Sequence, residues 1–500
     1  MKHLFHQFLV CLAPTIVKIG TGWRGTICFS LSLCPYVKRN YRSLFCSFFI
    51  LTLCAQVVSA EWIKEPQQNT PICTAKEEQH FPDLISDGHG GVIVAWHDAR
   101  NENRDVFAQR VSVTGEILWG NDGIPICDLP SPQSWPIILP GEEGDAIIVF
   151  GDSRHGNQDI YVQRIAANGK LLWDKSGVPV CIEPSLQEDV KAIPDGQGGA
   201  IILWEDSRHE NLDIYAQRID SNGKPAWEPN GVPVHKGEGD QYDPFLATDG
   251  TGGAIVAWWD ISTPDWNVFA QRINAAGEPV WEPEGVSICT ADGNQGGPFI
   301  VADGSGGAFV VWSDYRNDPN IYTSADLYAQ RINANGKPLW EKDGIPICNE
   351  PANQQQPKGI RDGMGGVIVV WWDDRDIFSD IYAQRIGPDG LPMWEVNGIP
   401  VCIAEGVQRE PRLVSDGSQG AIVYWMDYRE DYGDVTADAI YAQRIDASGK
   451  FLWAFNGIPV CTADGNQMMP RAVPNGNGGA FIVWSDERGE DPDIYIHQVP

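Results

Sequence analysis

An aromatic residue recurs at a nearly constant interval through most of this 500-residue chain. The first five occurrences are 54 residues apart, and the others follow at intervals of 59, 54 and 59: Trp96, Phe150, Trp204, Trp258, Trp312, Trp371, Trp425 and Trp484. Each belongs to one phrase, DG-x-GG, an apolar run, W-x-D-x-R, DIYAQRI, G-x-x-x-W and G-(I/V)-P-(I/V)-C. Repeats of this length are typical of solenoids, propellers and arrays, in which neighbouring units stabilise one another.

Each repeat has the pattern of four short β-strands. In the third repeat, an apolar run at 200–204 follows a glycine-rich turn at 195–199, and an alternating segment rich in β-branched and aromatic residues covers 213–219. Residues 190–193 and 232–234 supply the other two strands. No segment has the 3.6-residue period of an amphipathic helix. Four strands in about 54 residues, repeated eight times, predict an all-β fold, the eight-bladed β-propeller.

The ends of the repeat region favour a closed ring over an open β-solenoid. The last repeat stops at its third strand, residues 493–496, and the missing fourth strand has its counterpart far upstream at 71–73. We therefore expect the N-terminal strand to complete the last blade, which removes a free sheet edge. An open solenoid would not need complementary fragments at its two ends.

Residues 1–60 differ in character from the repeats. A basic segment at 38–42 precedes an apolar stretch at 44–58, and small residues precede Ala60, as in a secretory signal peptide cut after that residue. A transmembrane anchor is the alternative, but the apolar core of about 15 residues is short for a span. We expect an exported protein, secreted or at the cell surface, without a membrane span in the mature chain. The predicted domains are a misplaced start or extension at 1–36, a signal peptide at 37–60 and the propeller at 61–500.

Charge excludes one class of partner. The formal net charge is −31, and removal of residues 1–60, which hold six basic and no acidic residues, leaves about −37. A surface this acidic repels phosphate backbones, so nucleic acid is not an expected partner. We predict a monomer that carries no cofactor.

The DIYAQRI phrase at 380–386 and the DGSGGA phrase at 303–308 resemble the tandem repeats of propeller proteins secreted by bacteria, a functionally uncharacterised group. The resemblance covers about residues 61–500. It implies the propeller fold and export, and it implies no particular activity because propellers host many functions.

Seven cysteines share one repeat position, and His235 replaces the cysteine in the third repeat: Cys73, Cys127, Cys181, Cys289, Cys348, Cys402 and Cys461. Equivalent outer positions of neighbouring blades should lie on the order of 12–15 Å apart, whereas a disulfide needs Cα atoms within roughly 7 Å. We therefore predict small buried thiols, with no disulfides. The histidines lack ligand spacing and the DG-x-GG turns lack alternating acidic ligands, so no metal site is predicted.

The W-x-D-x-R motif and the DIYAQRI strand supply a repeated set of charges. The fourth repeat alone has Ser262 in place of the arginine, and it alone begins its third strand with Asn267 in place of aspartate. This joint loss predicts that each arginine forms a structural ion pair across its own hairpin loop, Arg208 with Asp213 and Arg375 with Asp380. The alternatives are a cation-binding acidic ring and a catalytic carboxylate pair.

The repeats differ most at the start of the innermost strand, where they present Asp83, Ile137, Lys191, Phe245, Phe299, Lys358, Arg412 and Arg471. Three consecutive bases thus adjoin two phenylalanines in an otherwise acidic protein. Aromatic faces suit sugar rings, and arginine suits carboxylate or sulfate. The predicted ligand-binding residues are Lys358, Arg412, Arg471, Phe245 and Phe299, with Trp266 from a nearby loop. Two inserted loops, at 320–325 with Tyr322 and at 432–437 with Tyr432, are expected on the same face.

The alternative for the basic residues is pairing with nearby acids such as Glu410 or Asp83. We predict a binding or interaction module for an acidic glycan or protein segment at the channel mouth, and we favour this over an enzyme. A carbohydrate-active hydrolase or lyase is the first alternative, and it would need isolated carboxylates or a tyrosine or histidine base in the channel. A structural cell-surface or adhesion component is the third.

Overall fold

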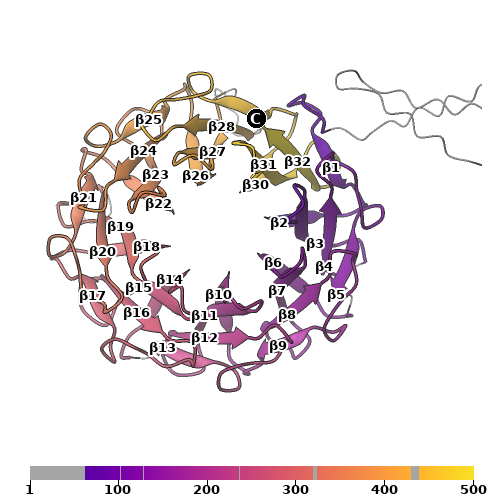
Figure 1. Ribbon diagram of the computed structural model, residues 1–500, viewed down its shortest axis with the longest axis horizontal. Coiled ribbons are helices and arrows are strands. Elements are labelled where there is room, and N and C mark those ends of the chain that lie inside the picture. The colour runs from indigo at the N-terminus through magenta and orange to yellow at the C-terminus, as the bar shows by residue number, and fades with distance from the viewer. Residues whose placement is uncertain (1–61, 102, 128, 236, 319–323, 430–437) are drawn as a thin grey trace, which may run out of the picture. The chain divides into compact units, whose positions relative to one another are not determined.

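The computed structural model describes residues 62–500 except 102, 128, 236, 319–323 and 430–437. The described residues form 32 strands and no helix, in eight four-stranded antiparallel sheets around a central axis (Figure 1). The fold is an eight-bladed β-propeller, as the repeats predict. The predicted signal peptide at 37–60 and the extension at 1–36 lie outside the described residues.

Each blade runs from an innermost strand at the axis to an outermost strand at the rim (Figure 1). The innermost strands all begin with glutamine: β2 (Gln79–Ser86), β6 (Gln133–Pro140), β10 (Gln187–Pro194), β14 (Gln241–Thr248), β18 (Gln295–Ala302), β22 (Gln354–Arg361), β26 (Gln408–Ser415) and β30 (Gln467–Pro474). The second strands are β3 (Val92–Asp98), β7 (Ala146–Asp152), β11 (Ala200–Asp206), β15 (Ala254–Asp260), β19 (Ala308–Asp314), β23 (Val367–Asp373), β27 (Ala421–Asp427) and β31 (Ala480–Asp486).

The third strands are β4 (Asp105–Val111), β8 (Asp159–Ile165), β12 (Asp213–Ile219), β16 (Asn267–Ile273), β20 (Asp326–Ile332), β24 (Asp380–Ile386), β28 (Ala439–Ile445) and β32 (Asp493–Val499). The outermost strands are β1 (Thr70–Cys73), β5 (Ile124–Cys127), β9 (Val178–Cys181), β13 (Val232–His235), β17 (Val286–Cys289), β21 (Ile345–Cys348), β25 (Ile399–Cys402) and β29 (Ile458–Cys461). We number the blades 1 to 8 in the order of their innermost strands, from β2 to β30.

Blade 8 is built from two distant parts of the chain. Its strand order is β1-β32-β31-β30, and Thr70 pairs with Ile496 in the β1–β32 ladder. Next to this ladder, Arg488 Nη2 donates to Asn69 Oδ1 at 2.8 Å. The N-terminal strand therefore closes the ring, as the sequence predicts, and covers the edge that β32 would otherwise expose.

The recurring aromatic lies in the core between blades. At all eight positions it is at most 1% exposed: Trp96, Phe150, Trp204, Trp258, Trp312, Trp371, Trp425 and Trp484. Trp204 also stacks on Tyr215 of the adjacent strand, with ring centroids 6.4 Å apart. An aromatic side chain buries roughly 150–250 Å², so this one position supplies a large share of the apolar contact that joins each blade to its neighbour.

The aspartate and arginine of W-x-D-x-R form a buried cluster that also joins blades. In blade 3, Asp206 accepts hydrogen bonds from Trp204 Nε1 at 2.7 Å and from Arg208 Nε at 2.8 Å. Arg208 also donates to the Asn230 carbonyl at 2.9 Å and to Cys181 Sγ, on the last strand of blade 2, at 3.5 Å. We call this cluster of tryptophan, aspartate, arginine and the preceding blade's cysteine the inter-blade staple.

In the structure, these arginines have ion-pair partners other than those that the sequence predicts. Salt bridges join each arginine to the aspartate two residues earlier, as in Arg208–Asp206 and Arg375–Asp373. The predicted partners, Asp213 and Asp380, lie opposite those aspartates in the hairpin register. The reason is the turn, which folds the arginine back on the nearer carboxylate and rests its guanidinium 3.9 Å from the Tyr215 ring centroid. Burial and neighbouring aspartates raise the pKa of Asp380 to about 7.

All seven cysteines of the described chain are buried and free of disulfides, as predicted. Their contacts are more polar than the prediction of small apolar side chains implies, since Arg100 Nη2 donates to Cys73 Sγ at 3.0 Å. Burial raises the pKa of Cys73 to about 12, so this thiol stays protonated at neutral pH.

Blade 4 has a modified staple. Ser262 stands where the arginine is found elsewhere, and its backbone N–H donates to Asp260 at 2.8 Å. His235 of blade 3 fills the space, with Nε2 3.8 Å from Asp260 Oδ2 and its ring stacked on Trp258 at a centroid distance of 5.2 Å. The imidazole thus replaces the guanidinium, and the exchanges at 235 and 262 compensate one another.

Candidate functional site: the channel wall

A β-bulge near the start of every innermost strand shapes the channel wall. In β22 the register with β23 shifts between Gln355 and Lys358. In all eight blades the bulge residue has a left-handed backbone, and only Gly297 among the eight is glycine. The eight bulge residues are Phe81, Trp135, Asp189, Asp243, Gly297, Gln356, Glu410 and Met469. A left-handed conformation costs most residues roughly 1–2 kcal/mol. Since seven bulges tolerate that cost, the sheet and not the local residue imposes this shape.

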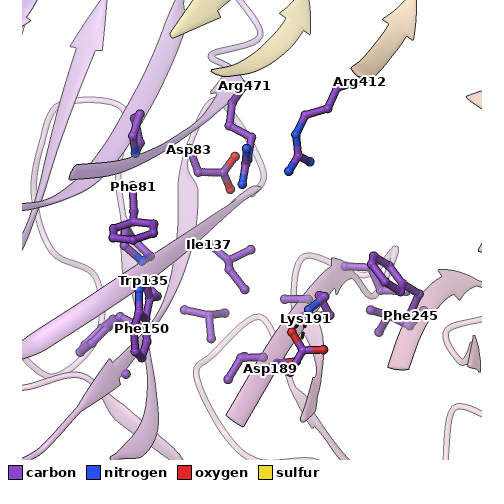
Figure 2. A pocket seen from close by; sticks show the side chains of 18 of the residues that line it. Phe81, Asp83, Trp135, Ile137, Phe150, Asp189, Lys191, Phe245, Arg412 and Arg471 are labelled. Carbon is purple, nitrogen blue, oxygen red and sulfur yellow. Dashed lines mark hydrogen bonds and ion pairs between the residues drawn. The ribbon is translucent and has the colours of Figure 1, made fainter. Parts of the chain in front are cut away.

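A cavity of about 910 Å³ lies inside the ring. The residues that follow the bulges of all eight innermost strands line it: Asp83, Ile137, Lys191, Phe245, Phe299, Lys358, Arg412 and Arg471. Figure 2 shows several of them pointing into the same space. The structure therefore brings together five of the six predicted ligand-binding residues.

The phenylalanine pair forms the aromatic part of the wall. The rings of Phe245 and Phe299 are 5.3 Å apart between centroids and inclined at 59°. Lys358 Nζ lies 5.4 and 5.1 Å from the two centroids, and Lys191 Nζ lies 5.2 Å from that of Phe245. Burial, with added repulsion from Arg412, lowers the pKa of Lys358 to about 8. The ammonium is therefore held against aromatic faces in a partly dehydrated setting.

Arg412 and Arg471 enter the cavity from blades 7 and 8 (Figure 2). Burial and the nearby Arg471 lower the pKa of Arg412. Arg471 Nη1 donates to the Pro470 carbonyl at 3.1 Å. Within the described chain, neither arginine nor Lys358 has a carboxylate oxygen within the 4.0 Å of a salt bridge. Lys191, by contrast, forms an ion pair with Asp189 (Figure 2).

Asp83 is the carboxylate that faces the arginines (Figure 2). Its two oxygens accept hydrogen bonds from the backbone N–H groups of Leu84 at 3.0 Å and Ile138 at 3.1 Å. Burial raises the pKa of Asp83, and the positive charge of Arg471 opposes that rise. The acid named in the alternative interpretation thus acts on the arginines through space, without a direct salt bridge.

Tyr424 is a cavity residue that the repeat comparison missed. It lies directly opposite Arg412 in the β26–β27 register and is 3% exposed. The other second strands carry an aliphatic residue here: Ala95, Val149, Leu203, Ala257, Val311, Val370 and Val483. Burial raises the pKa of Tyr424, whereas both nearby arginines favour its ionised form. The signal in the sequence is a lone phenol within an apolar run.

Trp266 does not line this cavity, contrary to the prediction. Its place in the loop after β15 stacks it on Trp259, with ring centroids 4.6 Å apart. The two inserted loops fall mainly outside the described residues, and so do Tyr322 and Tyr432.

The chemistry of this wall suits an anion. Three cations without salt bridges to described residues lie in one cavity with the half-buried carboxylate of Asp83, beside an aromatic pair. The described residues contain no group of three or more histidine, cysteine, aspartate or glutamate side chains that could hold a metal ion. They also include no helix that could cross a membrane.

No protein-family model and no curated protein matches the chain. Among solved structures, an ulvan lyase of a polysaccharide lyase family is 12% identical, with 85% of this chain and 94% of that one covered and a TM-score of 0.45. A puromycin-hydrolysing peptidase of Mycobacterium tuberculosis is 13% identical, with 85% and 61% covered and a TM-score of 0.45.

An α-L-arabinanase of Penicillium chrysogenum is 12% identical, with 73% of this chain and 92% of that one covered and a TM-score of 0.34. Similarities at this level carry no argument about what the present chain binds or catalyses.

Proposed function

We propose that this protein is an exported binding module that holds an acidic glycan in its central channel. One observation carries the proposal: Lys358, Arg412 and Arg471 meet in one cavity without a salt bridge to any described residue, beside Phe245 and Phe299. The cations occur together in a chain whose net charge is −31. Ordinary surface chemistry would surround them with acids, so their isolation indicates a place for an anion.

The energetics support an anionic ligand. Burial penalises the charged form of Lys358 and of Arg412, and each penalty grows with the other cations nearby. A carboxylate or sulfate between them would favour the charged forms and supply the missing acceptors. The guanidinium fork binds such groups through paired hydrogen bonds. The two phenylalanines offer an apolar face to the C–H side of a sugar ring.

Export and monomeric state belong to the same proposal. The pattern at 37–60 supports a secretory signal peptide, which would deliver the propeller outside the cytoplasm, to a secreted or cell-surface location. The acidic surface argues against nucleic acid as the partner.

A binding experiment tests the channel site. The mature chain is applied to an array of neutral, uronate and sulfated oligosaccharides beside a peptide library, and the best acidic ligand is titrated by calorimetry. Replacing both arginines, Arg412→Ala with Arg471→Ala, should weaken binding at least 100-fold, since each charged hydrogen bond lost costs about 1.5–3 kcal/mol. Arg361→Ala, at the other end of the Lys358 strand, is the matched control. Unchanged affinity in the double variant, or binding of peptides alone, contradicts the proposal.

A carbohydrate-active hydrolase or lyase is the second candidate, and Tyr424 favours it. A phenol opposite Arg412 in the β26–β27 register, in the cavity that Asp83 also lines, is a group that can exchange a proton with a bound sugar. Tyr424→Phe should then abolish release of products from the array ligand while binding is retained. If no product forms with the unaltered protein, the binding module stands alone. A purely structural cell-surface component would bind nothing on the array.

A further inference from the structure

Lys358 is an amine of the channel wall without an acidic partner among the described residues. It is half-buried in β22, and within the described chain its Nζ donates only to the Pro357 carbonyl, at 3.3 Å. No carboxylate oxygen of a described residue lies within the 4.0 Å of a salt bridge. The other lysine of this wall, Lys191, forms an ion pair with Asp189. The cavity thus holds one lysine that a carboxylate neutralises and one that none of the described carboxylates neutralises.

The surroundings of the Lys358 amine favour its neutral form. Its Nζ lies 5.4 and 5.1 Å from the ring centroids of Phe245 and Phe299, so apolar groups replace part of its water. The charged side chains that act on it are mostly positive: Arg412, Lys191, Asp243 and Arg471. Burial first, and then these charges, lower its pKa from 10.5 to about 8. At pH 7 roughly a tenth of the amine is therefore neutral, about 300-fold more than in an ordinary lysine. A neutral amine beside cations in an apolar pocket is the form in which lysine acts as a nucleophile.

Two arginines in the same cavity provide an anchor for a carboxylate. Since β22, β26 and β30 are consecutive innermost strands, Lys358, Arg412 and Arg471 occupy the same position in adjacent blades. Both guanidinium groups point into the cavity (Figure 2), and neither has a salt bridge to a described residue. The cavity volume of about 910 Å³ is within the roughly 300–1,000 Å³ of small-molecule sites. A small acid bound by the guanidinium forks therefore shares its space with the Lys358 amine.

We propose that Lys358 forms an imine with a small 2-oxo acid whose carboxylate is bound by Arg412 and Arg471. The neutral Nζ attacks the carbonyl carbon next to the carboxylate, so an N–C bond forms and the carbonyl π electrons move to oxygen. This oxygen and the two hydrogens of the amine then leave as water, and a C=N bond remains. No oxidant, reductant or further reactant is needed. A 2-oxo acid fits because its carboxylate and its carbonyl are on adjacent carbons. This activity goes beyond the proposed glycan binding and shares its arginines.

Reductive trapping with pyruvate, a simple 2-oxo acid, tests the imine. The mature chain is incubated with pyruvate and sodium cyanoborohydride, which reduces an imine to a stable secondary amine, and mass spectrometry of the peptides locates the adduct. At pH 7 Lys358 should be labelled at least about tenfold faster than any other lysine, because more of its amine is neutral. Lys358→Arg should lose this fast adduct. Lys191→Arg is the matched control, and its Lys358 should be labelled as in the unaltered protein.

Two further measurements distinguish a binding site from an amine that is merely reactive. Labelling of Lys358 should rise with pH and level off above about pH 8, whereas ordinary lysines gain reactivity up to about pH 10.5. The double variant, Arg412→Ala with Arg471→Ala, should lose at least about tenfold more of its labelling by pyruvate than of its labelling by acetone, which has the carbonyl without the carboxylate. Thermal melting of each variant confirms that it is folded.

The outcomes separate this activity from glycan binding. If pyruvate labels all lysines at similar rates, or labels the double arginine variant as fast as the unaltered protein, the imine site is overturned and the proposed function is unaffected. If pyruvate labels Lys358 selectively and no acidic oligosaccharide binds, the imine site stands and the proposed function is overturned. If both ligands bind, a saturating acidic oligosaccharide should block labelling. Labelling that persists would place the glycan outside the channel and contradict the proposed function.

Discussion

Two of the arginines of blade 7, Arg429 and Arg412, lie in opposite electrostatic settings. Arg429 donates to Asp427 at 2.8 and 2.6 Å, and its guanidinium lies 3.7 Å from the Tyr441 ring centroid. Although burial opposes it, the hydrogen bonds to Asp427 raise the pKa of Arg429. Arg412 has no salt bridge to a described residue, and burial with the nearby Arg471 lowers its pKa.

The difference separates the scaffold from the candidate site. The staple arginine recurs in seven blades with the same aspartate beneath it, so its charge belongs to the repeat. Basic residues of the channel wall occur at only some blades, and three of them, Lys358, Arg412 and Arg471, have no salt bridge to a described residue. A repeated and satisfied charge stabilises the fold, whereas an isolated and unsatisfied one indicates a ligand.

Removing the acceptor of a staple should have the largest effect. Asp427→Ala leaves the Arg429 guanidinium and the Trp425 indole N–H without the carboxylate that binds both. A charge left buried without its partner costs about 3–5 kcal/mol of the free energy of unfolding. Guanidinium denaturation followed by fluorescence measures this, with Arg361→Ala as control. A loss below about 1 kcal/mol would place the staple with weak surface pairs.

Ligand affinity should depend on pH through Lys358, whose pKa is lowered from 10.5 to about 8. An anion binds the charged amine, so affinity should fall about tenfold between pH 7 and 9 as the amine loses its proton. The stability of the ligand-free protein should change in the opposite direction. From about pH 8 to 10.5 the unfolded chain keeps a proton that the native state has lost, so the free energy of unfolding rises.

Calorimetric titration with the acidic ligand across this pH range measures how the affinity depends on the charge of Lys358. Lys358→Arg is the control, because arginine stays charged throughout and should give a flat profile. A profile that keeps its slope in this variant assigns the titration to another group.

The modified staple of blade 4 should show coupling between two positions. Ser262→Arg alone crowds His235, and His235→Cys alone removes the imidazole beside Asp260. The double change restores the pattern of the other blades, so the two effects on the free energy of unfolding should differ from additivity by about 1 kcal/mol. A double-mutant cycle by denaturation measures the difference, and simple additivity would show that the two exchanges are unrelated.

Neutralising a wall arginine should have the smallest effect on stability. Arg412→Met replaces a half-buried charge that has no salt bridge to a described residue with an apolar chain of similar length. The free energy of unfolding should therefore stay constant or rise by up to about 1 kcal/mol. Arg429→Met removes the arginine of the inter-blade staple in the same blade, so it should lower the free energy of unfolding. If both variants lose stability equally, Arg412 belongs to the scaffold.

Repetition explains how much of the fold the sequence predicts. Eight copies of one phrase fix the strand pattern, and the missing last strand points to Thr70–Cys73 as its replacement. The staple partner is not predictable in this way. The joint loss of arginine and aspartate in blade 4 suggests a pair across the hairpin, whereas the compensating residue is His235 in another blade. These contacts between blades join two different repeat positions 27 residues apart, so a comparison of equivalent positions within each repeat does not pair them.

The same limit applies to the site. Residues such as Phe245 and Arg412 share one repeat position, so their meeting in the channel follows from the symmetry of the ring. Tyr424 lies in an apolar run, where a tyrosine resembles ordinary core.

The closing strand also imposes an order on folding. Arg488 Nη1 donates to the Gln67 carbonyl, 421 positions earlier in the chain. During synthesis β1 therefore emerges first and waits for β32, its partner in the β1–β32 ladder, which emerges last. Pairing across so long a segment carries a loop-closure entropy cost, and non-local topology slows folding. Formation of blade 8 should thus be the final step of folding, in which the short β1–β32 ladder closes the ring.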